Sequence, residues 1–386
     1  MSATQRQSPR RRFLRRAAGL AAAAWLFPSV ARAGGAPDPE RLVRRVADFV
    51  LEDFPQPPPF NWGEGVLMTG MMRAWELTGE QRYLDFVRAF GDHHHRRGIT
   101  ATLSRRGYCG HWGPGFPMLM LYEATGRRVY LQLAEQIVDF IMHKADRTAD
   151  GGLAHFSGRP QLWVDTLAMC CPVLSAMARV AGRPELEAEA IRQLEIFARH
   201  LQDPGTGLYY HMWDERSGRR TPAFWARGNG WVVLAAVETL NNEPAGDGQY
   251  ADRLRKLLAK QLAGLVPLQD PKTGLWHTVL DEPDTYVEGS ASSLFLYGLA
   301  EVAEAKWLDA PPRDCVRRAW RGVASTVEPS GRVTGVSEGT GPSDSAGYQA
   351  RKRGTYTWGT GALLLAACAV DQCPVVVASD SSAKGR

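Results

Sequence analysis

The sequence predicts an all-α protein of a single domain, an (α/α)₆ barrel with six inner and six outer helices. Three observations predict this fold. A short sequence motif with Asp, Gly and His, called the phrase below, recurs along the chain. Helices that are apolar all round alternate with helices that are apolar on one side only, and no strand pattern exceeds a few residues. The chain has 386 residues, 44% hydrophobic content and 12 tryptophans, as is typical of a large folded domain.

The repeated phrase follows an amphipathic helix each time. Its three best copies are Asp150–His155, Asp203–His211 and Asp270–His277, and a weaker copy is Glu328–Val333. The Asp, Pro and Gly residues end a helix and turn the chain, whereas the tail that ends in histidine favours a short extended piece.

The helices on either side of these phrases are of two kinds. In the helix before the second phrase, Leu186, Leu194 and Leu201 belong to a single apolar stripe, and charged residues fill the other face. Such a helix covers a core from outside. Six other segments are apolar nearly all round and are expected to be buried: residues 65–77, 116–125, 173–180, 232–240, 292–302 and 362–370.

Two helical architectures fit an alternation of buried and amphipathic helices. An open solenoid has regular repeat lengths and polar caps. Here the insertions vary in length and all precede the buried helices, so we expect a closed toroid with an inner and an outer ring.

Residues 1–33 are expected to be a removable export signal of the twin-arginine (Tat) type. Arg10-Arg11-Arg12-Phe13-Leu14 precedes an apolar run, and Ala31-Arg32-Ala33 matches a cleavage site with small residues. A membrane anchor is the alternative, but the run is too short to span a bilayer. We therefore expect a periplasmic or secreted protein without a membrane anchor, formed by the barrel domain (34–378) and a disordered tail (379–386).

The positive charge of the chain belongs to this first segment. Residues 1–33 hold seven arginines and no acidic residue, so their removal changes the formal net charge from +5 to −2. A nearly neutral domain lacks the broad basic field that nucleic-acid binding uses, so no nucleic-acid partner is expected. The six cysteines form no CxxC pair, and His93-His94-His95 is interpreted as a solvated helix end, so no metal is expected.

An unusual cluster of aromatic, charged and glycine residues precedes each buried helix. Inner helices of a closed barrel run parallel, so these clusters are expected to meet at one mouth. The six clusters lie at residues 60–65, 110–115, 162–166, 224–231, 286–290 and 356–361.

Such a mouth is suited to an anionic sugar. Helix N-termini present unsatisfied N–H groups and partial positive charge, tryptophans offer flat apolar faces, and the Arg227 guanidinium can hold a carboxylate through two hydrogen bonds. The alternative for any single cluster is that Trp and Gly only cap and pack the helices. Six clusters at equivalent positions favour a binding site, and an acidic oligosaccharide is the expected partner.

Three strings in this order and spacing resemble the unsaturated uronyl hydrolases of glycoside hydrolase families 88 and 105. They are Trp163-Val-Asp165-Thr166, Gly207-Leu-Tyr-Tyr-His211 and Trp225-Ala-Arg227-Gly-Asn229-Gly-Trp231. The resemblance extends from about Trp62 to Ala367.

The resemblance implies hydration of a vinyl ether. Asp165 matches the aspartate that protonates C4 of a C4=C5 double bond and activates water for attack at C5, which requires a pKa raised by burial. An N-cap role is the alternative for this residue. By the same resemblance His211, Trp225 and Arg227 match substrate-contacting positions, and Trp62 and Trp231 are candidates for stacking or for the wall of the site. No metal and no organic cofactor are implied.

The chain departs from the family pattern at the second inner helix. These enzymes present a second aspartate near an Asn-Pro-Gly turn, whereas Gly110–Gly115 contains no carboxylate. Three consequences are compatible with this change: His111 orients the sugar instead, the substrate preference differs, or activity is lost.

Two other functions fit the same residues. An inverting (α/α)₆ glycosidase needs two carboxylates, which Asp165 and either Glu64 or Glu288 would supply. A non-catalytic periplasmic binder would hold uronate fragments without consuming their double bond.

Overall fold

The computed structural model describes residues 37–54, 57–243, 249–309 and 311–377. The expected export signal and the expected tail lie outside these residues. Within the described ranges no helix is both long enough and apolar enough to cross a membrane.

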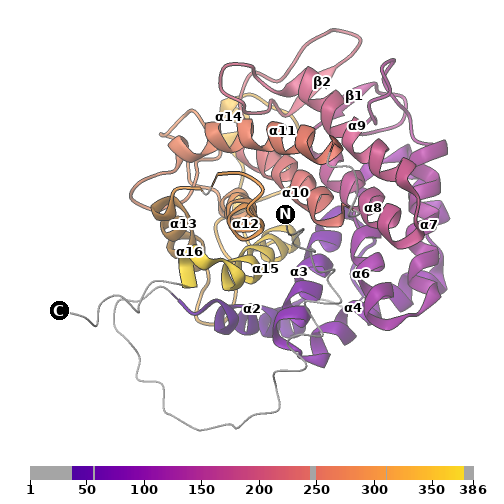
Figure 1. Cartoon of the computed structure of the whole chain (residues 1–386), viewed down its shortest axis with the longest axis horizontal. Coiled ribbons are helices and arrows are strands. Elements are labelled where there is room, and N and C mark those ends of the chain that lie inside the picture. Colours follow the sequence, from indigo (N-terminus) through magenta and orange to yellow (C-terminus); the bar gives the residue numbers. More distant parts are fainter. Residues whose placement is uncertain (1–36, 55–56, 244–248, 310, 378–386) are drawn as a thin grey trace, which may run out of the picture.

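Helices of two kinds alternate along the chain and form two concentric rings (Figure 1). The described inner helices are α3 (Trp62–Thr78), α6 (Gly115–Thr125), α8 (Asp165–Ala181), α10 (Ala226–Asn242), α12 (Gly289–Ala305) and α15 (Thr357–Gln372). The described outer helices are α2 (Pro39–Asp53), α4 (Gln81–Arg97), α7 (Arg128–His143), α9 (Pro184–Leu201), α11 (Gln249–Leu265) and α13 (Arg313–Ser325).

The inner ring is closed. Each inner helix packs on the next one along the chain, and the last, α15, packs on both α12 and the first, α3. Helix α2 packs on α15 and on α3, and so covers the seam between the two ends of the domain. The predicted closed barrel is therefore confirmed, and the open solenoid is wrong.

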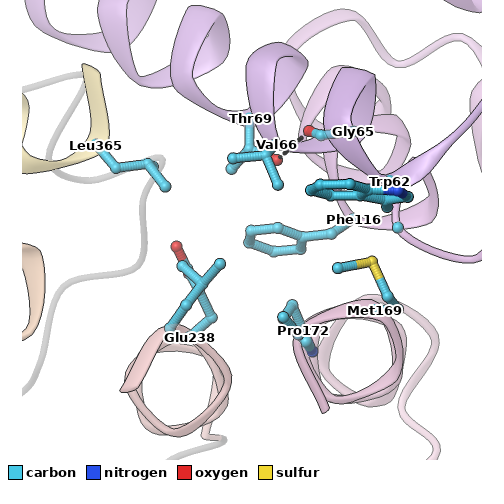
Figure 2. Close-up of a pocket in the computed structure, with 12 residues that line it drawn as sticks. Trp62, Gly65, Val66, Thr69, Phe116, Met169, Pro172, Glu238 and Leu365 are labelled. Atoms are coloured by element: carbon cyan, nitrogen blue, oxygen red, sulfur yellow. Dashed lines mark hydrogen bonds between the residues drawn. The ribbon is translucent and has the colours of Figure 1, made fainter. Parts of the chain in front are cut away.

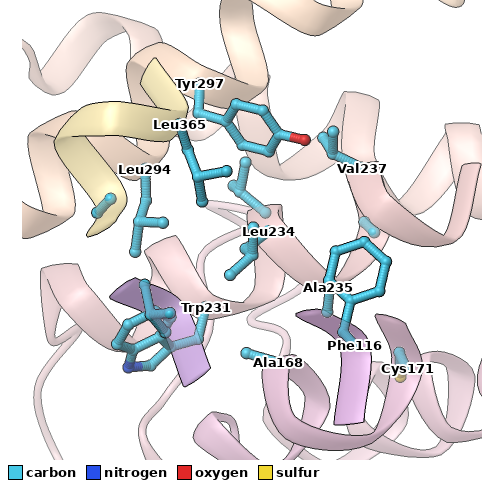
Figure 3. Packing of buried hydrophobic residues seen from close by; sticks show 14 of the residues in the cluster. Phe116, Ala168, Cys171, Trp231, Leu234, Ala235, Val237, Leu294, Tyr297 and Leu365 are labelled. Atoms are coloured by element: carbon cyan, nitrogen blue, oxygen red, sulfur yellow. The ribbon is translucent and has the colours of Figure 1, made fainter. Parts of the chain in front are cut away.

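Burial follows the two hydropathy patterns. In α9 the apolar stripe around Leu186, Leu194 and Leu201 is buried, while Glu185 at the start of the helix is exposed. In α10 nearly every residue is buried, since its neighbours in the ring cover two faces and outer helices cover another. Figure 3 shows Trp231 and Leu234 of α10 beside Leu294 of α12 and Leu365 of α15 in the shared core.

Two glycines let α3 and α15 approach closely where the ring closes. A Cβ atom at Gly361 would lie 2.4 Å from the Val66 carbonyl oxygen, and one at Gly70 would lie 2.8 Å from the Gly361 carbonyl oxygen. Both distances are shorter than a carbon atom tolerates, so larger side chains would push the two helices apart.

Short antiparallel pairings join the connections at one end of the barrel. Strand β1 (Gln161–Trp163) pairs with β2 (Met212–Asp214), and β3 (Val336–Ser337) pairs with β4 (Arg353–Gly354). The tails of the repeated phrases take part in single bridges, including Gln202 with Tyr209 and His277 with Val287, as the short extended pieces were expected to do. These pairings fix the connections relative to one another.

The remaining described elements are short. They are α5 (Thr100–Ser104), the 3₁₀ helices η1 (Arg105–Gly107), η2 (Cys109–His111) and η3 (Val266–Leu268), α14 (Ser345–Gln349) and α16 (Pro374–Val377). All six cysteines are buried. In the histidine run His95 is exposed as expected, but His94 is buried and its Nε2 atom lies 2.9 Å from the Pro58 carbonyl oxygen.

Candidate active site

Residues from the clusters before the inner helices contact one another at one end of the barrel. The Trp62 ring lies 4.6 Å from the Trp358 ring and 6.0 Å from the Trp231 ring, measured between centroids. The Thr357 hydroxyl donates to the Glu64 carboxylate at 3.3 Å. The predicted convergence of separate stretches of chain at one mouth is therefore present in the fold.

The β1–β2 pairing places Asp165 opposite His211. The backbone N–H of Val164 donates to the His211 carbonyl at 3.0 Å, directly beyond the paired strands. The Asp165 Oδ2 atom then lies 2.9 Å from His211 Nε2. Asp165 is the first residue of α8, which is capped by Val164 without a side-chain hydrogen bond, so the N-cap interpretation is wrong.

The environment of Asp165 shifts its pKa in two opposite directions. Burial raises the pKa of the carboxyl, but the charge and hydrogen bond of His211 outweigh burial and hold the pKa below its ordinary value. The side chain is 19% exposed, so it is accessible from the mouth. Our expectation that burial would raise this pKa overall is wrong for the site without substrate, because His211 stabilises the ionised form.

Two aromatic rings fix His211 from behind. The Trp225 ring lies 4.3 Å from the His211 ring, and the Tyr348 ring lies parallel to Trp225 at 5.7 Å. The Tyr348 Oη atom is 2.9 Å from His211 Nδ1. Trp225 is 2% exposed, so it forms a buried wall behind the Asp165–His211 pair.

Arg227 is fully buried between Trp225 and Trp358. Its guanidinium carbon lies 4.7 Å and 5.7 Å from the two ring centroids. Nη1 donates to the carbonyl of Ser337 at 2.8 Å and to its hydroxyl at 2.5 Å, while Nη2 donates to the Glu338 carbonyl at 2.7 Å and the Thr340 hydroxyl at 3.0 Å.

These partners leave no pair of N–H groups free at the end of the Arg227 side chain. The bidentate carboxylate clamp that we expected is therefore not offered by this geometry. The guanidinium instead holds the backbone after β3, and its charge acts on Asp165 only through space.

The two remaining candidate tryptophans differ in exposure. Trp62 is half-buried at the top of α3 and lines the cavity described below, so a face of its ring remains accessible. Trp231 is fully buried and meets Trp62 edge to face. Only Trp62 of this pair is placed to stack on a sugar, and Trp231 supports it from below.

His111 lies near the mouth on η2. Its Nε2 atom is 3.4 Å from the Arg105 guanidinium, and its Nδ1 atom is buried without a hydrogen-bond partner among the described residues. Burial, and then the charge of Arg105, lower the pKa of His111 to about 4. A neutral imidazole with one unpaired ring nitrogen is thus found in the region where the family's second aspartate is missing.

Sequence reasoning assigned no role to His155, but the structure places it beside the site. Its ring stacks on Trp163 with centroids 4.1 Å apart, and its Nδ1 atom lies 3.1 Å from both Cys109 Sγ and Thr166 Oγ1. Burial lowers the pKa of His155 to about 3. Its position in the first repeated phrase, equivalent to that of His211 in the second, was the signal that could have identified it.

The two glutamates proposed as second acids have different environments. Glu288 caps α12, is fully buried, and accepts hydrogen bonds from the Ser290 hydroxyl and from the backbone N–H groups of Ala291 and Ser337. Its oxygens are used within the protein, so it is not available to a substrate. Glu64 is half-buried, and burial raises its pKa.

A mostly apolar cavity lies inside the barrel next to this mouth. Trp62, Phe116 and Met169 point into it, and Glu238 lies at its far end (Figure 2). Ala168 and Met169 of its lining follow Asp165 by one helical turn. Glu238 is paired with Arg73 at 3.2 Å and accepts from the Tyr297 hydroxyl at 2.8 Å, so this acid is not free for chemistry.

The sequence profile described as Glycosyl Hydrolase Family 88 matches residues 40–373, which is most of the chain. The chain belongs to glycoside hydrolase family 88. It is 31% identical over 343 residues to the unsaturated rhamnogalacturonyl hydrolase YesR of Bacillus subtilis (strain 168), a match that covers 85% of this chain and 94% of that protein.

A second relative of the family 88 hydrolase is the unsaturated 3S-rhamnoglycuronyl hydrolase of Alteromonas sp. (strain LOR). The two are 26% identical over 324 residues, and the match covers 79% of this chain and 76% of that protein. The fold is similar to a solved structure described as a possible member of glycoside hydrolase family 105 from Salmonella enterica subsp. enterica serovar Paratyphi A str. ATCC 9150. That similarity has a TM-score of 0.78 at 24% identity and covers 90% of this chain and 99% of that one.

These similarities confirm two predictions for the family 88 hydrolase: the (α/α)₆ barrel and the membership of a hydrolase family. Membership of this family supports an enzyme rather than the non-catalytic binder. The role of each site residue remains a prediction from geometry. Tyr348 was missed altogether, because it lies beyond the weak copy of the phrase at Glu328–Val333, in a part of the connection without a repeated pattern.

Proposed function

We propose that this family 88 hydrolase removes a terminal 4,5-unsaturated uronic acid from acidic oligosaccharides that polysaccharide lyases generate. Asp165 is its general acid and then its general base. The observation that carries the proposal is the accessible Asp165 carboxyl, held 2.9 Å from His211 at the barrel mouth. The 31% identity to an unsaturated rhamnogalacturonyl hydrolase supports pectin-type fragments as the substrate class.

The reaction adds water across the double bond. Asp165 gives a proton to C4, the hydroxyl of a water molecule bonds to C5, and the second proton of that water returns to Asp165. The resulting hemiketal opens and the aglycone is released. One carboxyl group is sufficient because it alternates between acid and base, so a second carboxylate at the second inner helix is not required for the proton balance.

The lowered pKa of Asp165 is compatible with its role as an acid. The carboxylate of a bound uronate brings a second negative charge near Asp165 and opposes the stabilisation that His211 gives to the ionised form. Substrate binding therefore raises the pKa of Asp165 and favours its protonated form. The nearby Trp163 and Trp62 exclude water and strengthen this effect.

We assign the substrate contacts by exposure. Half-buried Trp62 stacks on a sugar ring, and the partly exposed Asp165 carboxyl faces the reacting carbons. His211 and His111 are buried, so His211 acts through Asp165, and the unpaired Nδ1 of His111 lies behind this surface. Trp225 and Trp231 act as walls behind these residues, and Arg227 acts through the backbone that it holds and through its charge.

A second candidate function is an inverting glycosidase that uses two acids. The raised pKa of half-buried Glu64 favours it, since a protonated carboxyl can act as a general acid. Such an enzyme would act on saturated sugars and would need both Asp165 and Glu64.

The decisive experiment follows the ultraviolet absorbance of the C4=C5 bond. The protein is incubated with a panel of lyase-generated oligosaccharides and with their saturated counterparts. We expect the absorbance to decay for at least one unsaturated acidic fragment, with no release of sugar from the saturated ones. Hydrolysis of the saturated sugars alone would contradict the proposal and support the two-acid mechanism.

Two further properties are proposed from the sequence. The twin-arginine motif predicts export to the periplasm or the medium, which fusion of residues 1–33 to a folded reporter would test. The reaction is proposed to need no metal or organic cofactor, and unchanged activity after dialysis against EDTA would support this.

A further inference from the structure

The connection between β3 and α15 brings a residue to the active site that the proposed reaction does not yet use. We call residues 337–349 the strap. Its last part is α14, and Tyr348 in that helix is fully buried against Trp225 and His211. Figure 1 shows α14 near the top of the view, where β1 and β2 also lie.

The Tyr348 hydroxyl completes a chain of hydrogen bonds that ends at Asp165. The backbone N–H of Ser343 donates to Tyr348 Oη at 3.0 Å. That oxygen lies 2.9 Å from His211 Nδ1, and His211 Nε2 lies 2.9 Å from Asp165 Oδ2. Each ring nitrogen of His211 therefore has one defined partner.

The donors and acceptors of this chain determine which nitrogen of His211 carries the proton. A phenol has one O–H donor and two acceptor lone pairs. Ser343 uses one lone pair, so the O–H group can donate to Nδ1, which leaves the proton of neutral His211 on Nε2, where it donates to Asp165. The Thr221 hydroxyl also bonds to Tyr348. Thr221 Oγ1 already accepts from the backbone N–H groups of His211 and Met212, so it donates to the second lone pair of Tyr348. With both lone pairs used, the Tyr348 O–H group has Nδ1 as its acceptor.

The strap is held at both ends, which keeps Tyr348 in place. Near its start, Arg227 donates to the carbonyls of Ser337 and Glu338, and Glu288 accepts from the Ser337 N–H at 2.8 Å. Near its end, the Tyr286 hydroxyl donates to the Tyr348 carbonyl at 3.3 Å. The buried Arg227–Glu288 pair, 3.5 Å apart, therefore acts on the site through the strap.

We propose that Tyr348 is a positioning residue that holds His211 in the Nε2–H tautomer and so orients the proton of the Asp165–His211 pair. It does not touch the substrate and acts through His211. This inference rests on the proposed hydration function and adds to it a residue from a different part of the chain. It explains why the strap is pinned so firmly by a buried charge pair.

The test compares Tyr348→Phe with the unchanged protein. The substitution keeps the ring on Trp225 and removes only the hydroxyl. We expect kcat to fall roughly 10–100-fold, as is usual when a residue that orients a reactive side chain is lost, with KM within about threefold. The pH profile of kcat should also change shape. The matched control is Tyr83→Phe on α4, which removes a buried hydroxyl bonded to Asp48 at 2.7 Å, far from the site, and should leave kcat and its pH profile unchanged.

A second measurement needs no substrate. In ¹⁵N spectra of the unchanged protein, with His211 assigned through a His211→Gln variant, neutral His211 should carry its proton on Nε2. In Tyr348→Phe the two tautomers should mix. Neutral His211 protonated on Nδ1, or a Tyr348→Phe enzyme with unchanged kcat, pH profile and ¹⁵N shifts, would overturn the inference. An unchanged protein that consumes no unsaturated fragment would instead overturn the proposed function.

Discussion

Asp165 is the residue on which the proposed chemistry depends, and its replacement separates the two mechanisms. Asp165→Asn keeps the size of the side chain but has no proton to give to C4. General acid–base residues contribute about 10²–10⁴-fold, so we expect a loss of that size in kcat/KM for unsaturated fragments, measured by the decay of absorbance. The loss should be largest near the pH optimum of the unchanged enzyme, where Asp165 is in its active protonation state.

Glu64→Gln is the companion variant for this measurement. A hydration that uses one carboxyl should retain activity within about tenfold of the unchanged enzyme, because Glu64 then contributes at most to binding. A collapse comparable to that of Asp165→Asn would show that two acids share the reaction.

The Trp62 ring provides a test of binding without chemistry. Trp62→Ala removes the accessible ring face but leaves Asp165 and His211 in place, so it should raise KM by about 10-fold, equivalent to about 1.4 kcal/mol, with a small change in kcat. Steady-state kinetics on the best substrate of the panel would measure both constants. An unchanged KM would mean that the sugar lies elsewhere in the mouth.

At the scale of single residues, the sequence predicted which residues form the site better than it predicted what each of them does. Asp165 and His211 were both identified because each belongs to a recognisable sequence motif, and the structure pairs them. Arg227 was also found, but its hydrogen-bond partners, Ser337, Glu338 and Thr340, come from a region about 110 residues later. A long-range contact of this kind leaves no local pattern, so the sequence could not distinguish a substrate clamp from a structural anchor.

Among the elements, the contact between α3 and α15 decides whether the ring closes. Gly361→Ala would place a Cβ atom 2.4 Å from the Val66 carbonyl oxygen, which is backbone and cannot turn away. Such overpacking costs about 1–3 kcal/mol, which we expect as a lower free energy of unfolding in urea titrations. Gly341→Ala is the control, because a Cβ atom there meets open space and the change should be nearly neutral.

The hydropathy pattern predicted the elements that recur along the chain, namely the inner and outer helices. Inner helices such as α10 are apolar all round because neighbours cover them on every side, and outer helices such as α9 carry one stripe, so both could be recognised from their residues. The strap has no such period. Its shape depends on the Arg227–Glu288 pair and on Tyr348 reaching His211, and neither contact is encoded within the segment itself.

For the whole molecule, buried histidines predict how stability depends on pH. Burial lowers the pKa of His111 to about 4 and that of His155 to about 3, and it also lowers the pKa of His94. In the unfolded chain these side chains bind protons near their ordinary pKa of about 6.5. Between about pH 6.5 and pH 4 the unfolded state therefore holds more protons than the folded state.

This difference fixes the sign of the pH effect. Stability rises with pH wherever the unfolded state binds more protons, so the contribution of these histidines is fully present above about pH 6.5. It is lost progressively as the pH falls towards the folded-state pKa values of about 4 for His111 and about 3 for His155. We expect the thermal midpoint to drop between pH 7 and pH 5. His111→Gln should make that drop smaller, whereas His95→Gln, a change at an exposed position, should leave it as it is. An equal drop in all three proteins would mean that His111 does not resist protonation in the folded barrel.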